Sequence, residues 1–196
     1  DSSQSRGLGD VYKRQMYNRV PELQYIAPRN ARGIFGSAAP RVVRNNKSGD
    51  YSIYGDYPIF TKIATKFIYD GGRFINQEDI DQERKVCVIG ERTQSELFED
   101  KENPIGGYIR ISGVFFQVIG VHKYVPGGGF ESDSDIFIPF TTFRKLYNTG
   151  DKVSWFAIAA YDDADILSVE EDVKTAMRSK YNVHPCLLYT SPSPRD

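Results

Sequence analysis

The most constraining feature of this sequence is a pair of β-type runs joined by two residues. The first run is Tyr108 to Ile111, the second is Val114 to Val121, and Ser112-Gly113 lies between them. A two-residue connection with Gly in second place matches the tight turns that follow the twist of paired strands. The segment is therefore predicted to form a β-hairpin, and the fold must contain antiparallel pairing.

Further short strands and helices are predicted on both sides of this hairpin. Apolar and β-branched runs predict strands near residues 23–27, 42–43, 51–53, 85–90, 136–140 and 153–161. A turn is expected at Lys47 to Asp50. These short strands favour an α+β (mixed α/β) fold with a central β-hairpin and peripheral helices.

Four helices are predicted from capping residues and apolar spacing. They are expected at 77–82 after an Asn76 cap, at 91–99, at 143–147 after a Thr141-Thr142 cap, and at 165–180. In the last of them Ile166, Val169, Val173 and Met177 recur at helical spacing, which predicts one apolar face.

The two ends of the chain carry sequences that one DNA element accounts for. A permitted codon choice for residues 186–196 has a reverse complement that, read one base along, translates as residues 5–15. That DNA resembles the adapter of transposase-based sequencing libraries, so both segments are excluded from fold reasoning as non-native additions. Residues 1–4 lie outside the first segment and are set aside with it. We therefore expect the protein segment to span residues 16–185.

Composition excludes several classes of function. The chain has 25 Lys and Arg against 26 Asp and Glu, a formal net charge of −1. A nucleic-acid surface needs a basic excess, so no nucleic-acid partner is expected. With Cys186 set aside, Cys87 stands alone, which excludes an internal disulfide framework. No apolar run is long enough to span a bilayer.

The sequence also lacks a catalytic constellation. Val86 to Gly90 leads into a helix, but neither GxGxxG nor GKS/T follows, which argues against a nucleotide site. His122 and His184 lie far apart, without Cys or His at ligand spacing. Cys87 lies within an apolar strand, where a thiol is normally inert. We expect no catalytic residue, no cofactor and no metal in this segment.

Eight short motifs follow one another through the middle of the chain. They are Gly72 to Phe74, Glu78-Asp79, Val86 to Gly90, Leu97-Phe98, Asn103 to Gly106, Ile109 to Gly113, Val118 to Val121 and Ile136 to Thr142. In this order and spacing they resemble the periplasmic core domain of MacB-type ABC transporter permeases, a family that includes FtsX-like and lipoprotein-release permeases. Each motif alone is weak, whereas the ordered set is specific.

The resemblance implies a domain organisation. It implies a two-lobed MacB-like domain inserted between the first two transmembrane helices and facing outward from the cytoplasmic (inner) membrane into the periplasm. Residues 57–142 would form the inserted lobe, and residues 16–56 with 143–185 would form a discontinuous second lobe. The membrane helices and any fused ATPase domain would lie outside this segment.

Function and partners follow from the same resemblance. A cognate ABC ATPase would hydrolyse ATP in the cytoplasm, and the permease, expected as a dimer, would relay that movement to this domain. The movement would drive efflux, lipoprotein release or the gating of an envelope or outer-membrane partner. The domain itself would not be an enzyme.

The motif residues are expected to support the fold rather than perform chemistry. Glycine suits the turns at Gly90 and Gly113 because it tolerates positive φ, and Pro104 suits a turn after the preceding helix. The set comprises Gly72, Arg73, Phe74, Asp79, Val88, Gly90, Phe98, Pro104, Ile105, Gly106, Gly113, Ile119, Gly120, Pro139, Thr141 and Thr142.

Partner contacts are expected on exposed loops, because such loops commonly carry binding. The candidate loops are residues 32–39 and 126–135, with candidate contact residues Gly127, Gly128, Gly129, Glu131, Asp133 and Asp135. Two alternatives stay open. One is a soluble extracytoplasmic ligand- or partner-binding module without an ATPase, and the other is an enzyme that uses a metal held by the acidic loop 131–135.

Overall fold

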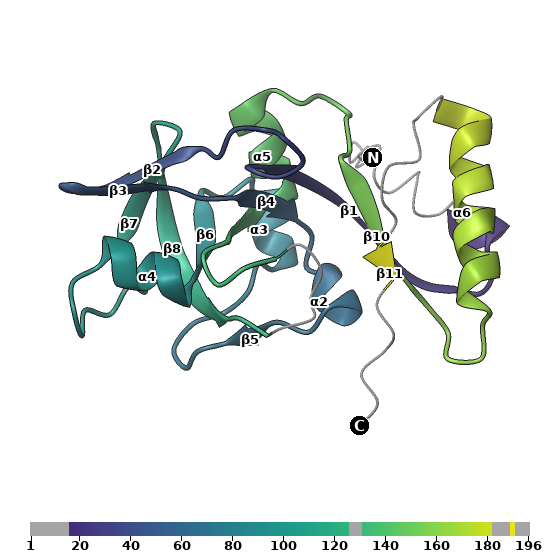
Figure 1. Cartoon of the computed structure of the whole chain (residues 1–196), viewed down its shortest axis with the longest axis horizontal. Coiled ribbons are helices and arrows are strands. Elements are labelled where there is room, and N and C mark those ends of the chain that lie inside the picture. The colour runs from purple at the N-terminus through teal and green to yellow at the C-terminus, as the bar shows by residue number, and fades with distance from the viewer. Residues whose placement is uncertain (1–15, 126–130, 182–188, 191–196) are drawn as a thin grey trace, which may run out of the picture.

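The structure is a computed structural model that describes residues 16–125, 131–181 and 189–190 (Figure 1). Its strands are β1 (Leu23–Arg32), β2 (Arg41–Arg44), β3 (Lys47–Asp50), β4 (Ile53–Asp56), β5 (Phe67–Ile68), β6 (Val86–Gly90), β7 (Tyr108–Ile111), β8 (Val114–Lys123), β9 (Ile136–Pro139), β10 (Trp155–Ala160) and β11 (Tyr189–Thr190). Its helices are α2 (Phe60–Ile63), α3 (Gln77–Asp81), α4 (Glu91–Leu97), α5 (Phe140–Tyr147) and α6 (Ile166–Tyr181). Residues 16–19 are helical as well. Within these ranges no helix combines the length and apolar character needed to cross a bilayer.

One mixed sheet runs through the described residues. Its strand order is β11-β10-β1-β4-β9-β6-β8-β7-β2-β3, and β5 pairs with β8 beside this path. The pairs β4–β9, β6–β8 and β10–β11 are parallel, whereas β1 pairs antiparallel with both β10 and β4. Helices pack around this sheet, so the predicted α+β class is confirmed.

The predicted hairpin is present as β7 and β8. Ile111 lies opposite Val114, and the two turn residues Ser112 and Gly113 have φ values of 47° and 86°. Positive φ at both positions is what the favoured hairpin turn requires. β8 then continues beside β6, so the hairpin forms part of the central core.

The chain near Lys47 differs from the prediction. The sequence predicts a turn at Lys47 to Asp50, but these residues form β3, which pairs antiparallel with β2. The turn lies at Asn45-Asn46 instead, where Asn45 has a φ of 52°. Asn enters the left-handed region more readily than most residues, so Asn45 marks the turn and Gly49 lies within the strand.

The predicted cap of α3 is confirmed. The Asn76 side chain accepts a hydrogen bond from the Asp79 backbone N–H at 3.0 Å, and the Asp79 carboxylate accepts one from the Asn76 N–H at 3.0 Å. This reciprocal capping box satisfies two backbone donors at the start of the helix.

The predicted cap of α5 is wrong. The helix begins at Phe140, with Pro139 at the capping position and no side-chain cap. The Thr141 and Thr142 hydroxyls instead donate to the carbonyl oxygens of Ile80 at 2.8 Å and Arg84 at 2.9 Å. These acceptors lie near the end of α3, so the two threonines join α5 to a distant segment of the chain.

A separate hydrophobic cluster lies at one end of the molecule, and we call it the end cluster. Its buried members are Met16, Val20, Leu23, Ile26, Ile158, Val169, Val173 and Ala176. Val169 and Val173 face inward as predicted, but Ile166 is 40% exposed, and the Met177 side chain lies outside the described residues. In Figure 1, α6 lies at the opposite end of the molecule from the β2–β3 hairpin.

The central core combines segments from all along the chain. Val42 and Ile53 from before residue 57, Cys87 and Ile89 from the middle, and Phe143 pack in one buried cluster. The expected lobe boundaries at residues 57 and 142 stay a prediction.

Candidate functional site

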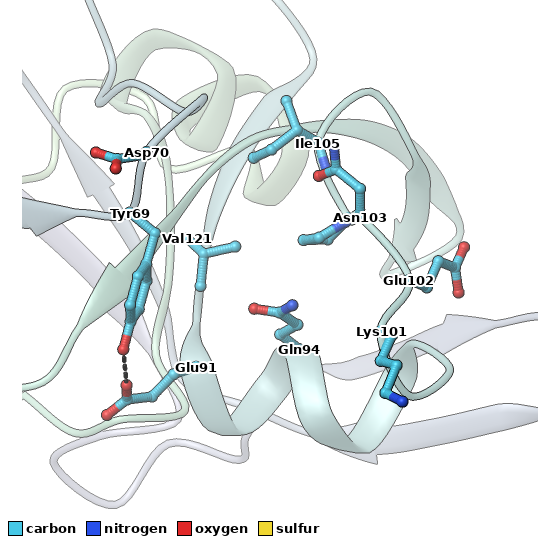
Figure 2. Close-up of a pocket in the computed structure, with 10 residues that line it drawn as sticks. Tyr69, Asp70, Glu91, Gln94, Lys101, Glu102, Asn103, Ile105 and Val121 are labelled. Atoms are coloured by element: carbon cyan, nitrogen blue, oxygen red, sulfur yellow. Dashed lines mark hydrogen bonds between the residues drawn. The ribbon is translucent and has the colours of Figure 1, made fainter.

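A surface groove of about 440 Å³ lies beside α4 (Figure 2). Its walls come from the turn after β5, from α4, from the turn before β7 and from β8. The lining residues are Tyr69, Asp70, Glu91, Gln94, Lys101, Glu102, Asn103, Pro104, Ile105 and Val121. Four separate segments therefore meet at this surface.

Six of the ten residues that line the groove carry charged or amide side chains. The Tyr69 hydroxyl donates a hydrogen bond to the Glu91 carboxylate at 2.7 Å, which closes one side. Gln94 points its amide into the groove, whereas the charged groups of Lys101 and Glu102 point away from it (Figure 2). The groove therefore presents an amide and one carboxylate beside an apolar wall, a pattern typical of binding surfaces.

The apolar wall includes two residues of the family motif. Pro104 is buried and Ile105 is half-buried, and both line the groove with Val121 of β8. Nothing in this arrangement pairs a nucleophile with a base. In the part of the chain that the structure describes, no group of three His, Cys, Asp or Glu residues could hold a metal ion.

The predicted contact loop turns two of its described carboxylates inward. The Glu131 side chain is 8% exposed and Asp135 is 2% exposed, whereas Asp133 is half-exposed. Gly127, Gly128 and Gly129 lie outside the described residues. Partner contact by this loop stays a prediction, and Asp133 is the described carboxylate best placed for it.

Asp135 closes a turn within the loop. Its carboxylate accepts hydrogen bonds from the Ser132 backbone N–H at 2.6 Å and the Ser132 hydroxyl at 2.9 Å. Burial raises the pKa of Asp135 to about 6, because the charged form loses contact with water. The Asp135 carbonyl oxygen lies 2.8 Å from Nε2 of the buried His122, which fixes this end of the loop to β8.

Glu131 belongs to a buried network of four charged side chains. Arg29 of β1 binds Asp56 of β4 through two contacts, Nε–Oδ1 at 2.6 Å and Nη2–Oδ2 at 2.9 Å. The same Nη2 atom donates to Glu131 Oε1 at 2.9 Å, and Lys66 donates to the other oxygen of Glu131. Two cations therefore balance two carboxylates.

Aromatic rings surround the two cations. The Arg29 guanidinium lies 3.6 Å from the centroid of the Phe60 ring and 5.1 Å from that of Trp155. The Lys66 ammonium lies 5.0 Å from the Phe137 ring centroid. Such stacking is favourable for cations that have lost water.

The charges in this network shift one another's pKa values. Burial alone lowers the pKa of Arg29, but Asp56 and Glu131 outweigh it and raise that pKa above its usual value. Burial alone raises the pKa of Glu131, but Arg29 and Lys66 lower it below its usual value. Both groups are therefore held in their charged forms.

Two glycines of the motif set allow backbone segments to approach closely. A Cβ atom on Gly120 would lie 2.4 Å from the Arg73 carbonyl oxygen, and one on Gly72 would lie 2.8 Å from the Gly120 Cα. No side chain fits in either place, so β8 and the turn after β5 can pack in direct contact.

The reason predicted for Gly90 is wrong. Its φ is −74°, which any residue adopts, whereas Gly113 has the expected positive φ of 86°. A Cβ on Gly90 would lie 2.0 Å from the Asp133 carbonyl oxygen. Glycine is needed here because the acidic loop packs against the start of α4.

Arg73 and Asp79 form an ion pair inside the motif region. The Arg73 guanidinium binds the Asp79 carboxylate through contacts of 2.6 Å and 3.0 Å. Burial alone raises the pKa of Asp79, but Arg73 and the Asn76 N–H lower it below its usual value. The other motif residues are buried at Val88, Phe98, Pro139 and Thr142, half-buried at Phe74, Ile119 and Thr141, and exposed at Gly106 and Gly113.

Arg29, Asp56 and Lys66 are the site residues that the sequence analysis misses. They lie on β1, on β4 and between α2 and β5, so no local spacing connects them with one another or with Glu131. The one signal in the sequence is an isolated charge next to apolar residues, as at Arg29, and that pattern is common on protein surfaces.

Comparison with known proteins supports the same class of protein. A sequence model described as the MacB-like periplasmic core domain matches residues 2–176, a range that includes all of residues 5–15, the first segment expected to be non-native. The pyoverdine export ATP-binding/permease protein PvdT of Pseudomonas syringae pv. tomato is 30% identical over 168 residues, which is 83% of this chain and 24% of that protein. The macrolide export ATP-binding/permease protein MacB of Syntrophobacter fumaroxidans is 38% identical over 96 residues, which is 47% of this chain and 13% of that protein. The chain thus spans at most a quarter of the length of these relatives.

Two solved structures share the fold. The periplasmic region of MacB from Actinobacillus actinomycetemcomitans has a TM-score of 0.67 at 20% identity, over 86% of this chain and 72% of that one. The extracellular domain of the ABC-type transporter YknZ from Gram-positive bacteria has a TM-score of 0.71 at 16% identity, over 88% of this chain and 84% of that one. At these identities the likeness concerns the fold alone.

Proposed function

This chain belongs to the MacB-like periplasmic core domain family, and we propose that it is the extracytoplasmic domain of an ABC transporter permease of the cytoplasmic membrane. In this proposal the domain passes ATP-driven movement of the membrane part to the export or release of a substrate. A cognate ATPase domain or subunit hydrolyses ATP in the cytoplasm, and this domain performs no catalysis.

The end cluster is the observation that carries this proposal. Met16 and Val20, from the start of the described chain, pack with Val173 and Ala176 of α6, near its end. A domain inserted between two membrane helices needs both of its connections on the same side. The packing of residues 16–20 against α6 meets that requirement.

β1 provides a route from the end cluster into the rest of the domain. Its residues Leu23 to Arg29 pair with β10, and its last three residues pair with β4 in the central sheet. A strand of 10 residues spans about 33 Å at about 3.3 Å per residue. Movement at the end cluster would therefore reach the centre of the domain along one continuous strand.

Partners of this domain follow from the proposal. The permease would act as a dimer with its ATPase, and an envelope or outer-membrane protein would receive the exported molecule. The groove beside α4 supports such a contact, because it is open, combines polar side chains with an apolar wall, and is formed by four segments. Asp133 is half-exposed and lies next to α4, because its carbonyl oxygen accepts a hydrogen bond from the Arg92 backbone N–H.

The proposal is tested in the full-length permease by replacing residues 16–181 with a flexible Gly/Ser linker. We expect ATP hydrolysis by the purified protein to stay within about twofold of the intact permease, because the ATPase is separate. Export should be lost in cells that lack other efflux pumps. Pyoverdine and a macrolide serve as probes, since relatives carry those names.

Unimpaired export of either probe without the domain would contradict the proposal. ATP hydrolysis by residues 16–181 alone would contradict it as well. If the intact permease lowers the accumulation of neither probe, the alternative of a ligand- or partner-binding module gains support.

A further inference from the structure

Residues 131–135 connect two parts of the domain that are distant in the sequence, and we call this segment the strap. At its first end Glu131 binds Arg29 of β1 and Lys66 at once, and the Arg29 contact is 2.9 Å. Both cations are buried, with side-chain exposures of 5% and 10%. β1 is also the strand that runs to the end cluster.

At its other end the strap is bonded to the start of α4. The Arg92 backbone N–H donates to the Asp133 carbonyl oxygen at 3.1 Å, and the Thr93 hydroxyl donates to the Ser134 carbonyl oxygen at 2.6 Å. The missing side chain of Gly90 allows this approach. α4 carries Glu91 and Gln94 of the groove, so the strap ends next to the groove.

The strap is also braced internally, between Ser132 and Asp135. The Asp135 carboxylate accepts two hydrogen bonds from Ser132, at 2.6 Å and 2.9 Å. A segment closed on itself in this way transmits a displacement better than an open loop, because fewer of its torsions are free.

We propose that the strap is a coupling element that passes displacement of β1 to α4 and to the groove beside it. The inference deepens the proposed function, on which its biological role rests, by naming the part that relays movement across the domain. Glu131 links the strap to β1, and the carbonyl oxygens of Asp133 and Ser134 link it to α4.

The buried charges make this link act in steps rather than gradually. If Glu131 leaves, Arg29 keeps Asp56 as its partner, but Lys66 loses the carboxylate to which it is hydrogen-bonded. An unpaired buried charge is costly, so positions between bound and released are disfavoured. Elements with two discrete positions are those that amplify small shifts.

Hydrogen exchange in the 196-residue chain tests the coupling from the strap to α4. In Glu131→Gln the amide keeps its size but loses its charge, and we expect exchange at the Arg92 amide to rise about tenfold or more. Amides of β7 should exchange as in the wild type, because the strap bonds to β1, Lys66, α4 and His122 of β8 rather than to β7. The matched control is Glu83→Gln, which removes the exposed ion pair with Lys145 and should leave Arg92 unchanged.

Coupling between two sites is reciprocal. A change at α4 should therefore reach Arg29 through the strap, and Thr93→Val tests this direction. This variant removes the bond to Ser134 but touches none of the four buried charges. We expect the fluorescence of Trp155, the only tryptophan, to change, because its ring lies 5.1 Å from the Arg29 guanidinium.

Two results would overturn the proposal. One is unchanged Arg92 exchange in Glu131→Gln together with unchanged Trp155 emission in Thr93→Val. The other is an equal rise in exchange at Arg92 and in β7, which would show loss of global stability only. Both measurements need neither membrane nor ATPase, so their failure leaves the linker-replacement test of the proposed function unaffected.

Discussion

Nη2 of Arg29 lies 2.9 Å from Oε1 of Glu131, and this contact joins residues that are 102 positions apart in the sequence. The two side chains are 5% and 8% exposed, so water screens the contact little. Arg29 is on the strand that connects the end cluster with the central sheet, and Glu131 begins the strap. One ion pair therefore holds together the two elements that the proposed movement would pass through.

Replacing Glu131 with Gln should lower the free energy of unfolding by about 3–5 kcal/mol, because the change leaves a buried cation without its carboxylate. Glu83→Gln should cost less than about 1 kcal/mol, since the partner Lys145 is 70% exposed. Urea denaturation followed by Trp155 fluorescence measures both values. Equal effects of the two changes would show that the buried network adds nothing.

Gly90→Ala and Gly113→Ala should differ in how much they destabilise the domain and in which part of it they disturb. At Gly90 the new Cβ would meet the Asp133 carbonyl oxygen at 2.0 Å with an ordinary φ, whereas at Gly113 it meets open space with a φ of 86°. We expect Gly113→Ala to cost about 1–2 kcal/mol through backbone strain alone. Gly90→Ala should cost more and should displace the strap.

Hydrogen exchange separates these two outcomes. Gly90→Ala should raise exchange at the Arg92 amide, as Glu131→Gln does, and Gly113→Ala should raise it only in the β7–β8 turn. A Gly90→Ala protein with wild-type stability and exchange would show that the close approach of Asp133 is not required.

Local signals account for the parts of the fold that the sequence predicts well. The Ser112-Gly113 turn and the Asn76 cap depend on residues within three or four positions of one another, so their chemistry is readable along the chain. Asn45 carries the same kind of signal, and the turn predicted at Lys47 to Asp50 is wrong because these residues, Gly49 included, pair with β2.

The errors concern residues whose partners are distant. The Thr141 hydroxyl finds its acceptor 61 positions away at Ile80, so a residue type suited to capping bonds across the fold instead. Position 90 must be Gly because the Asp133 backbone packs against it, and Arg29 is buried because Glu131 and Asp56 balance its charge. These contacts join residues that are far apart in the sequence, so no local pattern shows them. Partner contact by the candidate loop stays a prediction, and the inward-facing carboxylates of Glu131 and Asp135 could not be predicted from local sequence.

The titration of Asp135 should appear in the pH dependence of stability. Its pKa is about 6 in the folded chain against 3.8 ordinarily, so the unfolded chain releases this proton first as the pH rises. The contribution of Asp135 to stability is therefore present below about pH 4 and is lost by about pH 6, a fall of at most about 3 kcal/mol.

Asp135→Asn removes this titration and can keep the hydrogen bonds with Ser132. Glu131 and His122 have lowered pKa values and are present in both proteins, so the difference reports the titration of Asp135 together with its coupling to the Glu131 charge. The melting temperature of the variant relative to wild type should rise between pH 4 and pH 7. Asp133→Asn, a half-exposed carboxylate on the same strap, is the matched control, and a constant difference for Asp135→Asn would contradict the assignment.

A single introduced thiol tests which side of the membrane this domain occupies. Leu167 lies on α6 and is 75% exposed, so Leu167→Cys in the full-length permease should react readily. Cys87 is fully buried, and burial raises the pKa of its thiol, so it should stay unreactive in the folded domain.

A membrane-impermeant maleimide should label Leu167→Cys in intact spheroplasts to the same extent as after lysis. Val173→Cys, buried in the end cluster, should stay unlabelled in both. Labelling of Leu167→Cys only after lysis would place the domain in the cytoplasm and contradict the proposed function.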